Sequence, residues 1–124
     1  MLDLIIKRFE QPDEVREHEK GRFELITIAG LTIGRATYEP GWRWREHVGA
    51  LAGTPLCEVE HVGLVLEGRA MVQMADGREV EMRPGDLFYV GPQHDSWVVA
   101  DERYVSLHFL GADGYAKADA KGFA

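Results

Sequence analysis

The sequence predicts an all-β domain over residues 22–111. Short apolar runs rich in valine, isoleucine, leucine and aromatic residues are interrupted about every 8 to 12 residues by glycine or proline, as expected for short strands joined by turns. The length of 124 residues fits one such domain, with an extension before it (1–21) and a small polar tail after it (112–124). About nine strands in one open sheet would leave exposed edges, so a sandwich or a closed barrel is the expected architecture.

The extension that precedes the β-domain is predicted to contain a short helix. Residues 12–21 place Pro12 near a start, acidic residues early, Lys20 late and Gly21 at the end, which is the pattern of a surface helix. The preceding run LDLII (residues 2–6) has no evident role in a barrel core, so it is expected to pair with a partner chain or to cover a sheet edge. A homodimer is the resulting expectation.

The strands of the β-domain and the turns between them follow in chain order. The predicted strands are residues 23–29, 31–38, 42–48, 58–66, 70–75, 78–82, 87–90, 97–100 and 104–110. The Asp-Gly dipeptide at residues 76–77 is one that a two-residue hairpin favours. The Pro-Gly-Asp sequence at residues 84–86 suits another tight turn. Small residues at 49–55 predict a loop, and loops over a barrel mouth often flank binding sites.

Composition and charge argue against several classes of partner. There are 14 lysines and arginines against 21 aspartates and glutamates, and a formal charge of −7 does not suit nucleic acid or an anionic membrane surface. No apolar stretch approaches the roughly 20 residues of a membrane span. The short opening run contains Asp3, which is unlike a signal peptide, so a cytoplasmic protein is expected. The single cysteine, Cys57, excludes an internal disulfide.

A pattern of histidines and glycines points to a known family. Gly41 is followed after five residues by His47, and Gly68 closes the run LVLEG, with His61 seven residues before it. This spacing resembles the first motif of the cupin superfamily, in which a glycine, five residues, His-x-His, a glutamate and a glycine follow one another. His61 stands in the slot where the family usually has the glutamate. The resemblance covers about residues 31–110.

Two alignments of this first motif stay open. In one, His47 takes the first histidine slot and Gly49 the second, and the gap to His61 is longer than in the family. In the other, an earlier insertion puts Pro55 in the first histidine slot and Cys57 in the second. His61 occupies a ligand slot in both alignments, because the stretch that follows it has no gap.

The second cupin motif is matched less closely. Gly85 is in register, Ser96 falls in the slot of the family's histidine, and Ala100 falls in the slot of its asparagine. His94 lies two residues before the histidine slot. The resemblance implies a cupin double-stranded β-helix (jelly-roll) barrel that binds a small molecule, to which the pattern of residues 12–21 adds a short N-terminal helix.

Four residues are the candidate metal ligands: His47, Cys57, His61 and His94. Cys57 and His61 share one face of an extended strand, because side chains alternate along it. A thiolate with imidazoles suits zinc, with iron, manganese or nickel as alternatives, and the cupin resemblance supplies most of the support for this hypothesis. The alternative is that Cys57 is a small buried apolar residue and that the histidines are hydrogen-bonded core residues.

Further residues are candidates for contact with a substrate. Asp95 could orient the ring of His94 or act as a base, or it could be an ordinary turn aspartate. Three tryptophans offer broad apolar surface, although such residues also fill the core of a small barrel, and one further histidine could line the interior. The candidate substrate-binding residues are therefore Trp42, Trp44, Trp97 and His108.

Two functions from different classes fit these residues. The first is a divalent-metal-dependent enzyme of lyase, isomerase or oxygenase type that acts on a small molecule in the barrel. The second is a metal-free cupin that binds an apolar or aromatic ligand as a sensor, because the family's metal motif has lost a histidine and its glutamate. The sequence leaves open which reaction, if any, occurs. In either case His61 is the residue whose loss is expected to matter most.

Overall fold

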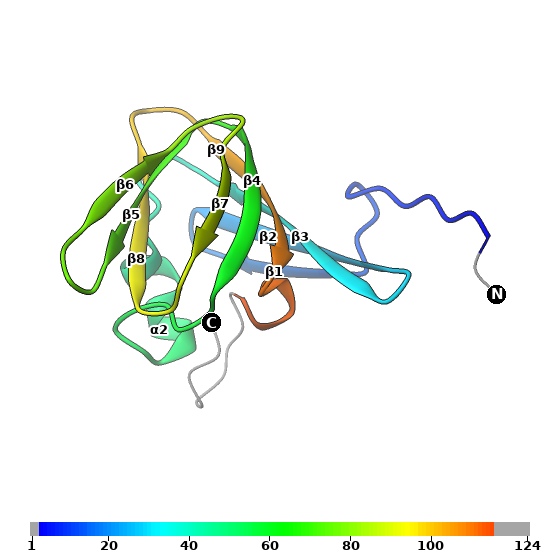
Figure 1. Ribbon diagram of the computed structural model, residues 1–124, viewed down its shortest axis with the longest axis horizontal. Coiled ribbons are helices and arrows are strands. Elements are labelled where there is room, and N and C mark those ends of the chain that lie inside the picture. The colour runs from blue at the N-terminus through cyan, green and yellow to red at the C-terminus, as the bar shows by residue number, and fades with distance from the viewer. Residues whose placement is uncertain (1–2, 116–124) are drawn as a thin grey trace.

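The computed structural model describes residues 3–115 and consists mainly of antiparallel β-strands (Figure 1). The strands are β1 (Glu14–His18), β2 (Gly21–Ile28), β3 (Leu31–Tyr38), β4 (His61–Glu67), β5 (Arg69–Met74), β6 (Glu79–Met82), β7 (Leu87–Val90), β8 (His94–Val99) and β9 (Tyr104–Leu110). The other elements are two short helices, α1 (Trp44–His47) and α2 (Gly49–Ala52), and one 3₁₀ turn, η1 (Ala112–Gly114). In this part of the chain no helix is both long and apolar enough to cross a membrane.

The strands form two sheets. A six-stranded sheet has the order β1-β2-β3-β9-β4-β7, a three-stranded sheet has the order β6-β5-β8, and all neighbouring strands are antiparallel. Because side chains alternate along a strand, each strand turns one set of residues inward. On β9, for example, Tyr104, Ser106 and His108 are buried, whereas Phe109 is exposed. The buried core contains residues of both sheets, among them Phe23, Tyr38, Val65, Val72 and Val98.

The predicted β-rich class is confirmed, and several predicted strands have the observed bounds. The strands predicted at residues 31–38, 87–90 and 104–110 coincide with β3, β7 and β9. In contrast, β8 begins three residues before its predicted start of 97, so that His94 lies in the sheet. The tail predicted after residue 111 begins with η1, and the next residue, Tyr115, is buried; residues 116–124 of that tail lie outside the described residues.

The helix predicted over residues 12–21 is wrong. The segment contains β1, which pairs with β2 at the edge of the six-stranded sheet, and the turn between them has Lys20 in the left-handed region at φ 62°. The charges that favoured a surface helix also suit a sheet edge, because charged side chains there hinder pairing with other chains. Hydrogen bonding to β2 decides between the two structures, and it is a contact that a local helix pattern does not contain.

The continuous strand predicted at residues 42–48 is also wrong. Arg43 makes an isolated bridge to β8, and α1 begins at Trp44. The buried carboxylate of Asp95 accepts a hydrogen bond of 3.0 Å from the backbone N–H of Arg45, which satisfies a free donor in the first turn of α1. The two residues are 50 positions apart, so this cap has no local sequence signal. The small-residue segment that follows, predicted as a loop, begins with α2.

Gly68, which joins β4 to β5, is expected to contribute strongly to the stability of the fold. Its φ is +73°, and a Cβ at this position would collide with the carbonyl oxygen of Arg103. Gly77 has a similar φ of +93°, but a Cβ there would meet open space. We expect Gly77→Ala to lower the free energy of unfolding by about 1–2 kcal/mol through its backbone conformation alone. Gly68→Ala should cost at least about 2 kcal/mol more, because the backbone must also move. Urea denaturation of both variants measures the difference, and equal losses would contradict the predicted close approach.

Candidate metal centre and cavity

Three buried residues, one from each sheet and one from the segment before β4, converge beside the core. Cys57 lies just before β4, His61 is the first residue of β4, and His94 is the first residue of β8. One ligand atom from each of them lies within 4.8 Å of the others. The backbone holds two of them together, because the N–H of Cys57 donates a hydrogen bond of 2.8 Å to the carbonyl oxygen of His94. This group could hold a metal ion.

The hydrogen bonds around the two histidines determine which ring atoms are available. Nδ1 of His94 lies 2.6 Å from the carbonyl oxygen of Gly91. A carbonyl oxygen only accepts, so Nδ1 carries the proton and the lone pair of the neutral ring is on Nε2. Nε2 of His61 lies 3.5 Å from Sγ of Cys57, and its buried Nδ1 has no hydrogen-bond partner among residues 3–115. Both rings therefore have a nitrogen that can coordinate an ion.

Burial sets the protonation states of the three residues. It lowers the pKa of His61 well below the usual value, with His108 and His94 adding to the effect, and it also lowers the pKa of His94. Both imidazoles are therefore neutral at pH 7, as coordination requires. Burial raises the pKa of the Cys57 thiol to about 12. A metal ion that binds here must displace the proton of this thiol.

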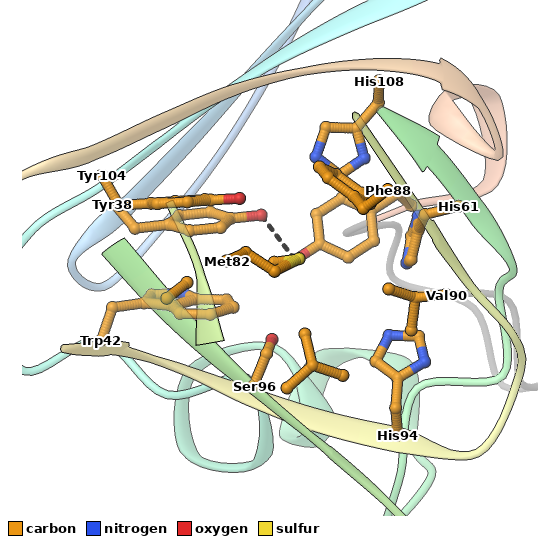
Figure 2. Close-up of a pocket in the computed structure, with 13 residues that line it drawn as sticks. Tyr38, Trp42, His61, Met82, Phe88, Val90, His94, Ser96, Tyr104 and His108 are labelled. Atoms are coloured by element: carbon orange, nitrogen blue, oxygen red, sulfur yellow. Dashed lines mark hydrogen bonds between the residues drawn. The ribbon is translucent and has the colours of Figure 1, made fainter. Parts of the chain in front are cut away.

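A small cavity of about 40 Å³ adjoins the histidines. This is room for an ion or a few water molecules, because one water needs about 10–15 Å³. The polar lining residues are His61, His94, His108, Tyr38, Tyr104, Tyr115 and Ser96. Figure 2 shows the imidazoles on one side, the stacked rings of Tyr38 and Tyr104 on the other, and the side chain of Met82 between them.

The tyrosine side of the cavity is an array of packed aromatic rings. The ring of Trp42 stacks on that of Tyr38 with centroids 3.8 Å apart, and its Nε1–H donates to Nε2 of His18 at 3.0 Å. The hydroxyl of Tyr38 donates a hydrogen bond of 2.5 Å to the hydroxyl of Tyr115. Burial raises the pKa of Tyr104 to about 12 and that of Tyr38 even further above its usual range. Both hydroxyls therefore stay protonated at neutral pH, and that of Tyr104 can act as a hydrogen-bond donor.

Of the four candidate ligands, His47 lies outside the converging group. Its Nδ1 is 3.0 Å from the backbone nitrogen of Arg43, whose N–H donates to it, and its Nε2 is 3.9 Å from a carboxylate oxygen of Glu19. The structure thus brings together Cys57, His61 and His94, the set of the second alignment together with the shifted histidine. The first alignment makes His47 a ligand, but in the structure His47 contacts Arg43 and Glu19 instead of the converging group.

The candidate substrate-binding residues divide into two groups. Trp42 and His108 line the cavity. Trp44 is fully buried but does not line the cavity, and Trp97 lies under the guanidinium group of Arg43, 4.7 Å from its ring centroid. Alternation along β8 explains the position of Trp97, because inward-facing His94 is three residues away and therefore on the opposite face.

Asp95, the candidate base, has its carboxylate oxygens engaged elsewhere. The group is fully buried and accepts hydrogen bonds from Nε of Arg43 at 2.8 Å, from the backbone N–H of Arg45 at 3.0 Å and from that of Ser96 at 2.9 Å. It does not line the cavity. These contacts join the segment before α1 to β8, and they give the carboxylate a structural role.

The tyrosines at the cavity were not among the candidate site residues. For Tyr104 a signal existed, because the predicted strand 104–110 puts it on the same face as Ser106 and His108. Tyr115 had no comparable signal, since it follows the last predicted strand. It is held in place from β1, where Nη1 of Arg16 donates a hydrogen bond of 2.6 Å to its carbonyl oxygen.

The buried histidines are expected to make the fold sensitive to acid. Burial, with a contribution from His94, lowers the pKa of His108 to about 4, and the pKa values of His61 and His18 are lowered as well. An unfolded histidine has a pKa of about 6.5. Between pH 4 and pH 6.5 the unfolded state binds more protons than the folded state. The contribution of these neutral histidines to the free energy of unfolding is therefore complete above pH 6.5 and is lost as the pH falls towards 4.

Denaturation of the metal-free protein at pH 7, 6 and 5 tests this sensitivity. We expect the free energy of unfolding to fall by up to about 1.4 kcal/mol per pH unit for each buried histidine that titrates. In the variant His108→Gln the free energy of unfolding should fall less steeply with pH, because one titrating histidine is missing. An unchanged slope in the variant would contradict the assignment of His108 to this effect.

The comparisons with known proteins concern the fold. No protein-family model matches the sequence, and no curated protein matches it. Among solved structures, the chain is similar to a cupin-like protein from Thermotoga maritima, with a TM-score of 0.51 and 14% identity over 71% of this chain and 65% of that chain. The fold is cupin-like. This agrees with the superfamily that the sequence motifs indicated.

Two structures of enzymes are also similar to the chain. One is oxalate decarboxylase from Lactobacillus farciminis in complex with formate, with a TM-score of 0.62 and 17% identity over 87% of this chain; the chain spans 32% of that protein. The other is ectoine synthase from P. lautus, with a TM-score of 0.60 and 12% identity over 86% of this chain and 78% of that chain. At these identities the likeness establishes a shared cupin-like fold.

Proposed function

We propose that the protein is a small single-domain cupin in which Cys57, His61 and His94 hold a divalent metal ion, first of all zinc, beside a cavity for a small-molecule substrate. The observation that carries the proposal is the convergence of three buried ligand atoms within 4.8 Å. A thiolate and two imidazoles are zinc ligands, and three protein ligands leave a tetrahedral ion one position for water or substrate. In this proposal the two sheets are the halves of the predicted jelly-roll barrel.

The residues around the cavity suit a metal-dependent enzyme. A bound ion supplies Lewis-acid chemistry or an activated water. The protonated hydroxyl of Tyr104 can donate a hydrogen bond to a polar group of the substrate, whereas that of Tyr38 already donates to Tyr115. Zinc favours a lyase or isomerase reaction, whereas an oxygenase reaction would use iron, manganese or nickel. The decarboxylase and the synthase among the similar structures support the choice of an enzyme.

A metal-free ligand-binding cupin is the second candidate, and one contact favours it. Sγ of Cys57 lies 3.5 Å from Nε2 of His61, within reach of a hydrogen bond between the two side chains. In this case the three residues form a hydrogen-bonded core cluster, and the cavity serves a sensor without catalysis.

Titration with Co²⁺ distinguishes the two candidates. We expect the tag-free protein to bind about one ion per chain with a thiolate-to-cobalt charge-transfer absorption band. The band should disappear in Cys57→Ser and persist in His47→Ala, whose side chain lies outside the group. Retention of less than about a tenth of an equivalent of cobalt or zinc per chain after reconstitution would reject the metal centre and leave the metal-free cupin.

We also propose that the chain forms a homodimer. The side chains of Leu4 and Ile6 are 81% and 78% exposed, and Figure 1 shows this segment leaving the sheets rather than covering an edge. The outward faces of β7 and β9 add Leu87 and Phe109, which are also exposed. Covering such apolar surface favours association. At a protein concentration of roughly tens of micromolar, light scattering should give twice the chain mass of 14.0 kDa. The mass of a single chain would refute the dimer.

A further inference from the structure

A second hollow lies on the surface between two strand edges that belong to different sheets. β6 ends the three-stranded sheet and β7 ends the six-stranded sheet, so each has one edge without a paired strand among the described residues. The groove between them has a volume of about 270 Å³. Its lining is apolar except for one arginine and one phenolic hydroxyl, and it includes two thioethers and two aromatic rings, those of Met74, Met82, Phe88 and Tyr89.

This groove is continuous with the wall of the metal-side cavity. Four residues, Val72, Met82, Phe88 and Val90, line both hollows. Val90 is paired with His61 across β7 and β4. A molecule in the groove is therefore separated from the histidines by a single layer of side chains.

The side chain of Met82 is the part of this layer that can move most easily. It points into the middle of the cavity, between the tyrosine side and the histidine side (Figure 2). Methionine is unbranched and flexible, and it changes rotamer at lower cost than the branched or aromatic neighbours. Withdrawal of this side chain would join the groove to the cavity.

The sizes and linings of the cavity and the groove indicate what kind of molecule could occupy both. The cavity holds little more than an ion and a few waters, so most of a substrate would have to lie in the groove. Thioether and aromatic walls favour an aromatic ring. Arg78 at the groove is already paired with an acidic residue, since its Nε lies 3.0 and 2.8 Å from the two carboxylate oxygens of Asp76. An uncharged ring therefore suits the groove better than an anionic one.

We propose that the groove between β6 and β7 binds the aromatic part of the substrate, and that Met82 is the movable partition between this groove and the metal centre. The substrate class is a small molecule with one uncharged aromatic ring and one polar, metal-binding head. The assignment of the head rests on the proposed function, whereas the binding of the ring does not.

Methionine methyl signals can test the groove directly. In protein labelled with ¹³C at the methionine methyl groups, Met74 and Met82 report on the groove, and Met71 is an internal control because it lines neither hollow. We expect benzohydroxamate to shift the signals of Met74 and Met82 in the zinc-loaded protein and to leave that of Met71 unchanged. It should also bind at least about tenfold more tightly than acetohydroxamate, which has the same head without the ring.

A pair of matched variants separates the groove from general surface effects. Val80 lines the groove and is 65% exposed, while Leu31 is 61% exposed and does not line it. Val80→Glu should remove the tenfold preference for benzohydroxamate and the shift at Met74 without changing the zinc stoichiometry. Leu31→Glu should change neither. Met82→Ala should speed the association of benzohydroxamate by about tenfold, because the partition is gone.

These experiments distinguish a failure of the groove proposal from a failure of the proposed metal centre. If zinc binds but the two hydroxamates bind equally and Met74 does not shift, the groove is overturned and the metal centre stands. If zinc does not bind, benzyl alcohol is the probe: shifts at Met74 and Met82 that Val80→Glu abolishes support the groove, and their absence overturns it. Shifts of Met74 and Met82 together that follow protein concentration without any probe would place a second copy in the groove and would also overturn it.

Discussion

Replacement of His61 by alanine is expected to reduce zinc affinity by more than about 100-fold, because even the loss of a group that only supports a ligand costs about 10- to 100-fold. The ring of His61 lies at the centre of the group: its Nε2 is 3.5 Å from Sγ of Cys57, and its centroid is 5.2 Å from that of His94. The domain should still fold, with a loss of about 1–3 kcal/mol in the free energy of unfolding. Competition with a chromophoric chelator measures the affinity, and urea denaturation measures the stability.

His47→Ala is the matched control for this experiment. The side chain of His47 is also largely buried, but it contacts Arg43 and Glu19 rather than the converging group. Its replacement should leave zinc affinity within about threefold of the wild type. The opposite result, with zinc lost in His47→Ala and retained in His61→Ala, would show that His47 rather than His61 is a ligand and that the proposed site is wrong.

Zinc binding is expected to release about one proton per ion at pH 7 and to become about tenfold tighter per pH unit between roughly pH 6 and 8. Burial raises the pKa of Cys57 to about 12, so the thiol is protonated throughout this range in the metal-free protein. Burial lowers the pKa values of His61 and His94, so these rings have no proton to lose there. The thiol is then the source of the proton, and raising the pH favours the bound state.

Calorimetric titration in two buffers with different ionisation enthalpies counts the protons released. In Cys57→Ala the count should fall to about zero and the affinity should no longer depend on pH in this range, although zinc would bind more weakly. Wild-type protein that binds zinc without releasing a proton would show that Cys57 is not a ligand. A release that persists in Cys57→Ala would assign the proton to another group.

The ligand candidates illustrate how far local reasoning reaches. Cys57 and His61 could be paired from the sequence, because an extended segment puts residues four apart on one face. His94 was named from a motif in which it is two residues out of register, and it reaches the group because β8 starts earlier than predicted. His94 lies opposite Cys57 because the two residues form an isolated β-bridge. This bridge joins segments far apart in the chain, so a local sequence pattern does not predict it.

Two local predictions failed where a distant partner outweighed a local pattern. The charged segment before Gly21 forms the edge strand β1, because β2 offers it a complete hydrogen-bonding ladder. The segment after Trp42 turns into α1, whose first turn is capped by the carboxylate of Asp95. In each case the residues are compatible with both structures, and the contact that decides lies elsewhere in the chain.

By itself, the sequence determined the β-rich class, the positions of most strands and turns, and the residue types of the candidate thiol–imidazole group. These depend on alternation and on turn residues, which act over a few positions. The tertiary structure alone decided that Cys57, His61 and His94 converge without His47, that tyrosines face them across the cavity, and that Met82 stands between. Such distances depend on which strands pair and in what register, and pairing is set by hydrogen bonds and packing between segments remote in the chain.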